Sequence, residues 1–355
     1  MKTLIVGLAL VAGCAKGASS RAPMGAAPST MAEPASAGAA AVAAGNPAVI
    51  ATGEDSVRPA AGQLTAGVWD DNLNFNFFTA YAQRMAQQSG DLGAFSFADQ
   101  RASMQQFAQL QGPHGELDVQ LVLDTTGSMG DELKYLQSEF DAISKELRAR
   151  YPQITPRWSL VVYKDRGDTY VTRPFDFTQD AIRFQRDLGA QSAGGGGDFP
   201  EAVIAGLDHG LAQHWRPDAN VAKIIFWVAD APPHPDEGGA LATLARRARD
   251  MGVHVYPIAS SGIDDSTEYQ MRATAQLTGG RYLFLTDDSR IGNGHAEPSI
   301  PCYAVTRLDH AILRVVDTEL SGKRLPTPVD QVVRRVGSPT AQGTCTVNEM
   351  QVVAF

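Results

Sequence analysis

The stretch that decides the fold is Leu121-Val122-Leu123-Asp124-Thr125-Thr126-Gly127-Ser128-Met129. Its apolar run ends abruptly at the carboxylate of Asp124, and the hydroxyls of Thr126 and Ser128 follow. A short apolar run bounded in this way predicts a buried strand. Mg²⁺ prefers near-octahedral oxygen ligands and keeps part of its water, so one carboxylate and two hydroxyls on a short loop suit it. The stretch therefore predicts a strand that ends in a loop able to bind a divalent cation.

This pattern resembles the metal-ion-dependent adhesion site (MIDAS) of von Willebrand factor type A (VWA) domains, whose first element reads Asp-x-Ser-x-Ser. Thr126 stands at the middle serine. A second element of that site is an aspartate after a buried strand, and Asp230 follows the apolar run Lys223–Ala229. The resemblance implies an α/β fold with a doubly wound, mostly parallel sheet and one antiparallel edge strand. Ligands of such sheets bind at the carboxyl ends of the strands.

The resemblance also implies what the site binds. Asp124, Thr126, Ser128 and Asp230 would hold Mg²⁺, or Mn²⁺ or Ca²⁺ in its place. The remaining coordination position would accept the carboxylate of an Asp or Glu side chain from a partner protein. The expected activity is therefore binding.

The third element of the family's site is normally a threonine in a glycine-rich loop, and here the pattern departs. The loop Gly194–Glu201 has no hydroxyl at that place but contains Asp198. Asp198 could bind the metal as a third carboxylate, which would strengthen metal binding and weaken the attraction for an acidic partner. Alternatively, Asp198 is the N-cap of the next helix, three residues before Glu201 as in a capping box, with Pro200 tolerated in the first turn.

Elsewhere in the chain, apolar runs typical of strands alternate with apolar residues at helical spacing. Apolar spacing predicts helices around residues 133–147, 181–188, 202–215, 241–248, 267–277 and 308–316, and strands around 158–162, 169–172, 223–229, 253–258 and 281–285. Alternating strands and helices predict a mostly parallel sheet. Residues 116–321 are assigned to the VWA domain, which at about 200 residues has the normal size of one domain.

Two further segments flank the predicted domain. Residues 63–115 are expected to form a helical lead-in, because Phe75, Phe78 and Tyr81 recur at helical spacing. Residues 70–72, Asp-Asp-Asn, are interpreted as the cap of that helix, with Ca²⁺ binding as the alternative. Residues 322–355 are expected to pack on the domain as a tail.

The amino terminus predicts export. Residues 1–13 read as a signal peptide, and Val11-Ala12-Gly13-Cys14 resembles a bacterial lipobox, in which Cys14 carries the lipid. An ordinary signal peptide that contains a cysteine is the alternative. Residues 14–62 are rich in Ala, Gly and Pro, a composition typical of a disordered tether. Because Ala15 rather than aspartate follows the cysteine, we expect an outer-membrane lipoprotein of the cell envelope, facing the periplasm or the outside.

The other two of the three cysteines, Cys302 and Cys345, are predicted to form a disulfide that pins the tail to the domain. Two free thiols are the alternative.

The net charge and the absence of certain motifs argue against several classes of function. The net charge is −9, with 30 basic and 39 acidic residues and no dense basic block, which argues against a nucleic-acid partner and leaves the lipid as the membrane contact. No nucleophile elbow, zinc-protease motif or phosphate loop occurs, so the chain is not expected to be an enzyme. A hydrolase that uses Asp124 and Asp230 is the alternative. The predicted function is divalent-metal-dependent protein–protein interaction; the alternative is a metal-independent scaffold of an envelope assembly.

Overall fold

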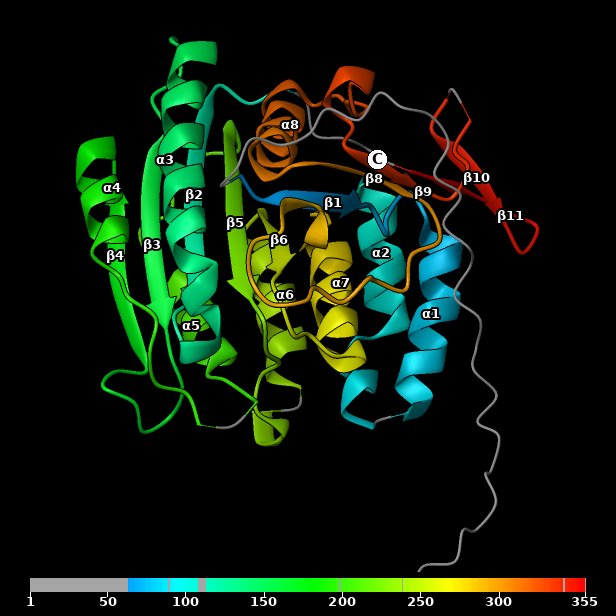
Figure 1. The fold of residues 1–355 in the computed structure, drawn as a ribbon, viewed down its shortest axis with the longest axis horizontal. Coiled ribbons are helices and arrows are strands. Elements are labelled where there is room, and N and C mark those ends of the chain that lie inside the picture. Colours follow the sequence, from blue (N-terminus) through cyan, green and yellow to red (C-terminus); the bar gives the residue numbers. More distant parts are fainter. Residues whose placement is uncertain are drawn as a thin grey trace, which may run out of the picture. The chain divides into compact units, whose positions relative to one another are not determined.

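The computed structural model describes residues 63–88, 90–107, 113–197, 199–237, 239–340 and 342–354. A sheet of nine strands lies between two layers of helices, with strand order β4-β3-β2-β5-β6-β7-β1-β8-β9 (Figure 1). The predicted class, an α/β fold with a mostly parallel, doubly wound sheet, is confirmed. The signal peptide, the tether with Cys14, and Asp198 lie outside the described residues.

The centre of the sheet is parallel. It contains β3 (Arg157–Tyr163), β2 (Glu116–Asp124), β5 (Val221–Ala229), β6 (Val253–Ala259) and β7 (Tyr282–Leu285). Apart from its third residue, β5 is buried along its whole length, as a parallel strand covered on both faces must be. The register pairs Leu123 with Val228, so β2 and β5 end side by side.

Both sides of the parallel core carry antiparallel strands. β4 (Thr172–Thr178) is the predicted antiparallel edge strand beside β3, although it begins where the predicted strand was expected to end. On the other side, β1 (Thr65–Trp69) lies between β7 and β8 (Tyr303–Arg307), and β9 (Arg334–Val336) follows at the edge. The sequence pattern predicted none of these last three strands.

β1 is short and depends on its neighbours. A Cβ atom on Gly67 would lie 2.2 Å from the Phe284 ring on β7, so the aromatic ring fills the space above the glycine. Because five residues with a central glycine carry little strand signal of their own, the segment was assigned to a helical lead-in. This assignment was incomplete: the lead-in contributes a strand to the middle of the sheet.

The helices form two layers. α3 (Leu133–Arg150), α4 (Ala181–Gly189) and α8 (Leu308–Ser321) pack on one face. The other face is covered by α1 (Phe75–Gln88), α5 (Val203–Leu211), α6 (Ala240–Asp250) and α7 (Asp265–Thr278), and α2 (Phe97–Phe107) packs on α7 (Figure 1). Single 3₁₀ turns lie at η1 (Gly90–Ala94), η2 (Gly127–Asp131), η3 (Pro235–Glu237), η4 (Asp287–Ser289) and η5 (Val329–Gln331).

Buried ion pairs join the lead-in to the domain. Asp71 accepts two hydrogen bonds from Arg272, at 2.7 and 2.9 Å, and Asp70 accepts one from Arg281 at 2.9 Å. Asp70 also accepts from the backbone N–H groups of Asn72 and Leu73, so it caps the turn that precedes α1; the helix itself begins at Phe75 and not near Leu73 as predicted. These carboxylates are therefore used by arginines and backbone donors.

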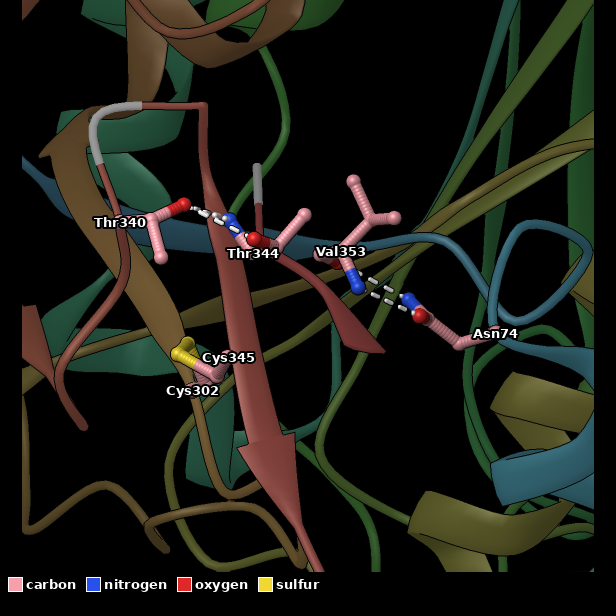
Figure 2. The surroundings of a disulfide bond; sticks show 6 residues. All are labelled: Asn74, Cys302, Thr340, Thr344, Cys345 and Val353. Carbon is pink, nitrogen blue, oxygen red and sulfur yellow. Dashed lines mark hydrogen bonds between the residues drawn. A yellow bond between two sulfur atoms is a disulfide. The ribbon is translucent and has the colours of Figure 1, made fainter. Parts of the chain in front are cut away.

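The C-terminal tail packs beside the lead-in segment. β10 (Thr344–Val347) and β11 (Met350–Val353) form a hairpin, and a disulfide joins Cys345 on β10 to Cys302, with the Cα atoms 6.4 Å apart (Figure 2). Val353 exchanges two backbone hydrogen bonds with the side chain of Asn74, at 2.7 and 2.9 Å. The predicted disulfide is confirmed. Within the described ranges, no helix has the length and apolar character needed to cross a bilayer.

Candidate metal centre

The predicted site lies at the carboxyl ends of two adjacent parallel strands. Asp124 is the last residue of β2, and Asp230 comes directly after β5. Asp124 is completely buried and Asp230 is 5% exposed. The 3₁₀ turn η2 begins at Gly127, shortly after Asp124, and keeps Thr126 and Ser128 close to the same strand ends.

Hydrogen bonds connect the four predicted residues. The backbone N–H and the hydroxyl of Thr126 both donate to Asp124 Oδ1, at 2.8 and 2.7 Å. The hydroxyl oxygens of Thr126 and Ser128 are 3.3 Å apart, and the Ser128 hydroxyl donates a hydrogen bond to the carboxylate of Asp230. The fold therefore brings Asp124, Thr126, Ser128 and Asp230 together.

The two carboxylates carry unsatisfied oxygens. Asp124 Oδ2 and Asp230 Oδ1 are buried and have no hydrogen-bond partner among the described residues. Burial, together with the negative charge of Asp230, raises the pKa of Asp124 to about 7, and burial also raises the pKa of Asp230. Buried carboxylates without a cation are costly. A divalent cation would satisfy these oxygens, so the residues present fit the metal that the resemblance implies.

One residue of the site was not predicted. Glu201 is 3% exposed, and its Oε2 has no hydrogen-bond partner within the described part of the chain. Burial raises its pKa to about 9, with further contributions from the negative charges of Asp124 and Asp165 and, less strongly, Asp230. The sequence placed Glu201 at the end of the glycine-rich loop. A second carboxylate in the loop from which the expected hydroxyl is missing was the signal that could have identified it.

The helix-cap interpretation of this loop is wrong. α5 begins at Val203, with Ala202 at the N-cap and no side-chain cap. Glu201 therefore precedes the helix and cannot be the third residue of a capping box. The reason is tertiary, because the Glu201 N–H donates to the Pro232 carbonyl at 2.9 Å and Glu201 forms a bridge with Pro233, which keeps the backbone extended.

The glycine-rich loop is held against the metal loop. The N–H of Gly127 donates to the carbonyl of Gly195 and the N–H of Gly194 to that of Thr125, at 3.0 and 3.1 Å. The ammonium of Lys164 donates to the carbonyls of Thr125 and Gly194. Gly195 has φ +82°, and a Cβ there would lie 2.2 Å from the carboxylate of Asp168. Only glycine therefore fits at this close approach.

A solvent-facing cleft of about 300 Å³ opens beside these residues. Ser128, Glu201 and Asp230 line it on the side of the site, and other residues, Phe199, Ala231, Ser261, Gly262, Asn293 and Gly294, complete it. The described ranges contain no group of three His, Cys, Asp or Glu side chains placed to hold an ion directly. A metal ion at this place would therefore need the hydroxyls of Thr126 and Ser128 as ligands in addition to the carboxylates.

Known proteins are similar to parts of this chain. The family model of the von Willebrand factor A domain matches residues 118–286. An alpha-protein kinase, vwkA, of Dictyostelium discoideum is 29% identical over 128 residues, which are 36% of this chain and 20% of that protein. An ariadne-like RING finger protein of Acanthamoeba polyphaga mimivirus is 27% identical over 194 residues, 48% of this chain and 18% of that protein. The chain spans about a fifth of the length of these curated relatives.

Among solved structures, the conserved hypothetical protein BatB of Bacteroides thetaiotaomicron is similar, with 14% identity and a TM-score of 0.38. The match covers 57% of this chain and 98% of that chain. The matched residues 118–286 contain β2 to β7 with Asp124 and Asp230, so this part of the chain is similar to von Willebrand factor A domains.

Proposed function

We propose that the VWA domain binds a partner protein through a divalent cation, Mg²⁺ or in its place Mn²⁺ or Ca²⁺, at Asp124, Thr126, Ser128 and Asp230. One observation carries this proposal: Asp124 Oδ2 and Asp230 Oδ1 are buried at adjacent strand ends without a hydrogen-bond partner among the described residues. Oxygen ligands of this kind are those that Mg²⁺ prefers.

The four residues of the site have different roles in this proposal. The hydroxyls of Thr126 and Ser128 already point at the two carboxylates, so the fold orients them before any ion binds. Asp124 and Asp230 supply the negative charge. A bound divalent cation would offer an open coordination position to an oxygen of the partner, and the cleft would admit the side chain that carries it.

The setting of this interaction is also part of the proposal. We place the domain in the cell envelope, anchored through a lipid on Cys14 and carried by the segment 14–62. We also propose that it binds without turnover. The kinase and RING finger names belong to the relatives, in which the matched region is about a fifth of the length.

A second candidate is a metal-independent scaffold with a degenerate site. The observation that favours it is the lack, within the described residues, of a ready group of three metal-binding side chains. In that case the raised pKa values of Asp124, Asp230 and Glu201 would favour the neutral forms of these carboxyl groups.

Calorimetric unfolding of the full chain, with Mg²⁺ or with EDTA, separates the two candidates. A ligand at 100 times its Kd stabilises the native state by about 2.7 kcal/mol, so Mg²⁺ should raise the Tm of the parent protein. Asp124→Asn should abolish the increase. Asp236→Asn, which removes a charge from a residue whose side chain is 69% exposed, should preserve it. Equal Tm values for the parent with Mg²⁺ and with EDTA would refute the metal-dependent function.

A further inference from the structure

We propose that Glu201 is a third carboxylate of the metal centre, acting on the ion through a bridging water, and that it makes the centre prefer an uncharged partner oxygen over a carboxylate. This inference rests on the proposed function, because it concerns the same ion. It changes the expected partner chemistry.

The position of Glu201 is the first step. Its backbone is tied to the segment after Asp230 by the hydrogen bond to the Pro232 carbonyl and the bridge to Pro233. A Cβ atom built on Gly196 would lie 3.0 Å from Glu201 Oε1 and 3.3 Å from Thr126 Cβ. The carboxylate of Glu201 and the side chain of Thr126 therefore lie close to the same point beside Gly196. Glu201 also lines the cleft with Ser128 and Asp230.

The buried carboxylate oxygens of this region lack hydrogen-bond partners. Three buried carboxylate oxygens, Asp124 Oδ2, Asp230 Oδ1 and Glu201 Oε2, have no hydrogen-bond partner among the described residues. Unpaired buried acceptors on three separate segments point to a ligand that can satisfy all of them. The described ranges contain no three such side chains close enough to hold an ion directly, so we assign Glu201 to a bound water. Mg²⁺ usually keeps several waters in protein sites.

The net charge of the proposed centre is negative. Three carboxylates and one divalent cation leave a formal charge of about −1, before the neighbouring Asp165 and Asp168 are counted. Both neighbours act on Glu201 with the same sign as Asp124 does. Lys164 is a neighbouring cation whose ammonium donates to the carbonyls of Thr125 and Gly194, and its one positive charge does not offset those of Asp165 and Asp168 together with the remaining −1. A partner carboxylate would therefore meet net repulsion, whereas an amide or hydroxyl oxygen would not.

Direct metal binding tests the first part. Mn²⁺ is titrated into the full chain and followed by electron paramagnetic resonance, in the parent, in Glu201→Gln and in Asp236→Asn. Removing a group that acts on a metal through its outer shell weakens binding 10–100-fold, so Glu201→Gln should show that loss. Asp236→Asn, with its exposed side chain, should change the Kd less than about twofold because salt screens surface charges.

The outcomes separate the two proposals. If the parent binds no Mn²⁺, the proposed function fails and this inference fails with it. If the parent binds Mn²⁺ and Glu201→Gln binds it equally well, only the role of Glu201 is overturned. Glutamine has the size of glutamate, and matching circular dichroism spectra would show that the variant is folded.

Small oxygen ligands test the second part. Acetate and acetamide are titrated at constant ionic strength while water-proton relaxation reports the waters on bound Mn²⁺. In the parent, acetamide should displace water at lower concentration than acetate does. In Glu201→Gln, the acetate concentration required should fall at least severalfold. Equal acetate binding by the two proteins would overturn the proposed preference for an uncharged oxygen.

Discussion

Replacing Arg272 by methionine tests whether the lead-in segment is part of the domain. Arg272 lies on α7 with a side chain that is 0% exposed. Its guanidinium donates to both carboxylate oxygens of Asp71, at 2.7 and 2.9 Å, and to Glu268 at 2.9 Å. It also lies 4.0 Å from the centre of the Tyr81 ring. Through Asp71 it holds the turn that follows β1.

The expected loss follows from these contacts. Methionine keeps most of the apolar stem but removes the cation, so the carboxylates of Asp71 and Glu268 remain buried without it. Removing one partner of a buried pair costs about 3–5 kcal/mol, and we expect a loss of about 4 kcal/mol in the free energy of unfolding. The triple variant with Asp71→Asn, Glu268→Gln and Arg272→Met should recover much of this loss, because neutral partners need no counter-charge.

Equilibrium unfolding in urea measures the effect, with tryptophan fluorescence and circular dichroism as probes. Trp69 donates to Asp71 at 2.9 Å and reports on this region directly. The control is Arg247→Met on α6, whose exposed pair with Asp208 should contribute less than about 1 kcal/mol. If Arg272→Met and Arg247→Met lower stability equally, or if the triple variant is as unstable as Arg272→Met, the reasoning about the buried charge is wrong.

Three further predictions concern other parts of the fold. Burial, with Asp309, raises the pKa of Glu139 from 4.5 to about 7. The folded state therefore binds the proton more tightly than the unfolded state, and stability should fall by up to about 3 kcal/mol as pH rises from 4.5 to 7. Glu139→Gln, which still accepts from the Leu64 N–H, should flatten this part of the pH profile in urea titrations, and an unchanged slope would contradict the assignment. Changing Cys302 and Cys345 to serine opens a cross-link across 43 residues, worth about 4 kcal/mol by loop entropy, and limited proteolysis should then cleave the tail first. Cleavage at the same rate in both proteins would show that the hairpin holds without the bond. Gly67→Ala should cost about 1–3 kcal/mol because its Cβ meets Phe284, and Phe284→Leu in the same chain should restore part of that loss in thermal unfolding. A double variant no more stable than Gly67→Ala would exclude the steric explanation.

Local pattern was enough to predict the centre of the sheet and most of the site. The strand before Asp124 and the strand before Asp230 are continuous apolar runs, and each ends at a carboxylate. Such runs are typical of parallel strands covered on both faces, and the carboxyl ends of neighbouring parallel strands share one edge of the sheet. The meeting of Asp124, Thr126, Ser128 and Asp230 followed from these two facts.

What the pattern could not predict depends on contacts between distant segments. β1 has only five residues and is stabilised by pairing with β7 and β8, more than 200 positions away in the chain. Glu201 looked like a helix residue because Asp and Glu three positions apart are typical of a cap. The bridge to Pro233 keeps it extended and turns its side chain toward the cleft.

The amino-acid sequence by itself determined the parallel α/β core and the loop that presents oxygen ligands, because burial on both faces and the abrupt end of an apolar run are properties of neighbouring residues. The tertiary structure was needed to show that the lead-in adds a strand to the sheet and that Glu201 lines the cleft with Ser128 and Asp230. Both depend on hydrogen bonds and packing between segments far apart in the chain. These contacts cannot be predicted from any short stretch of sequence.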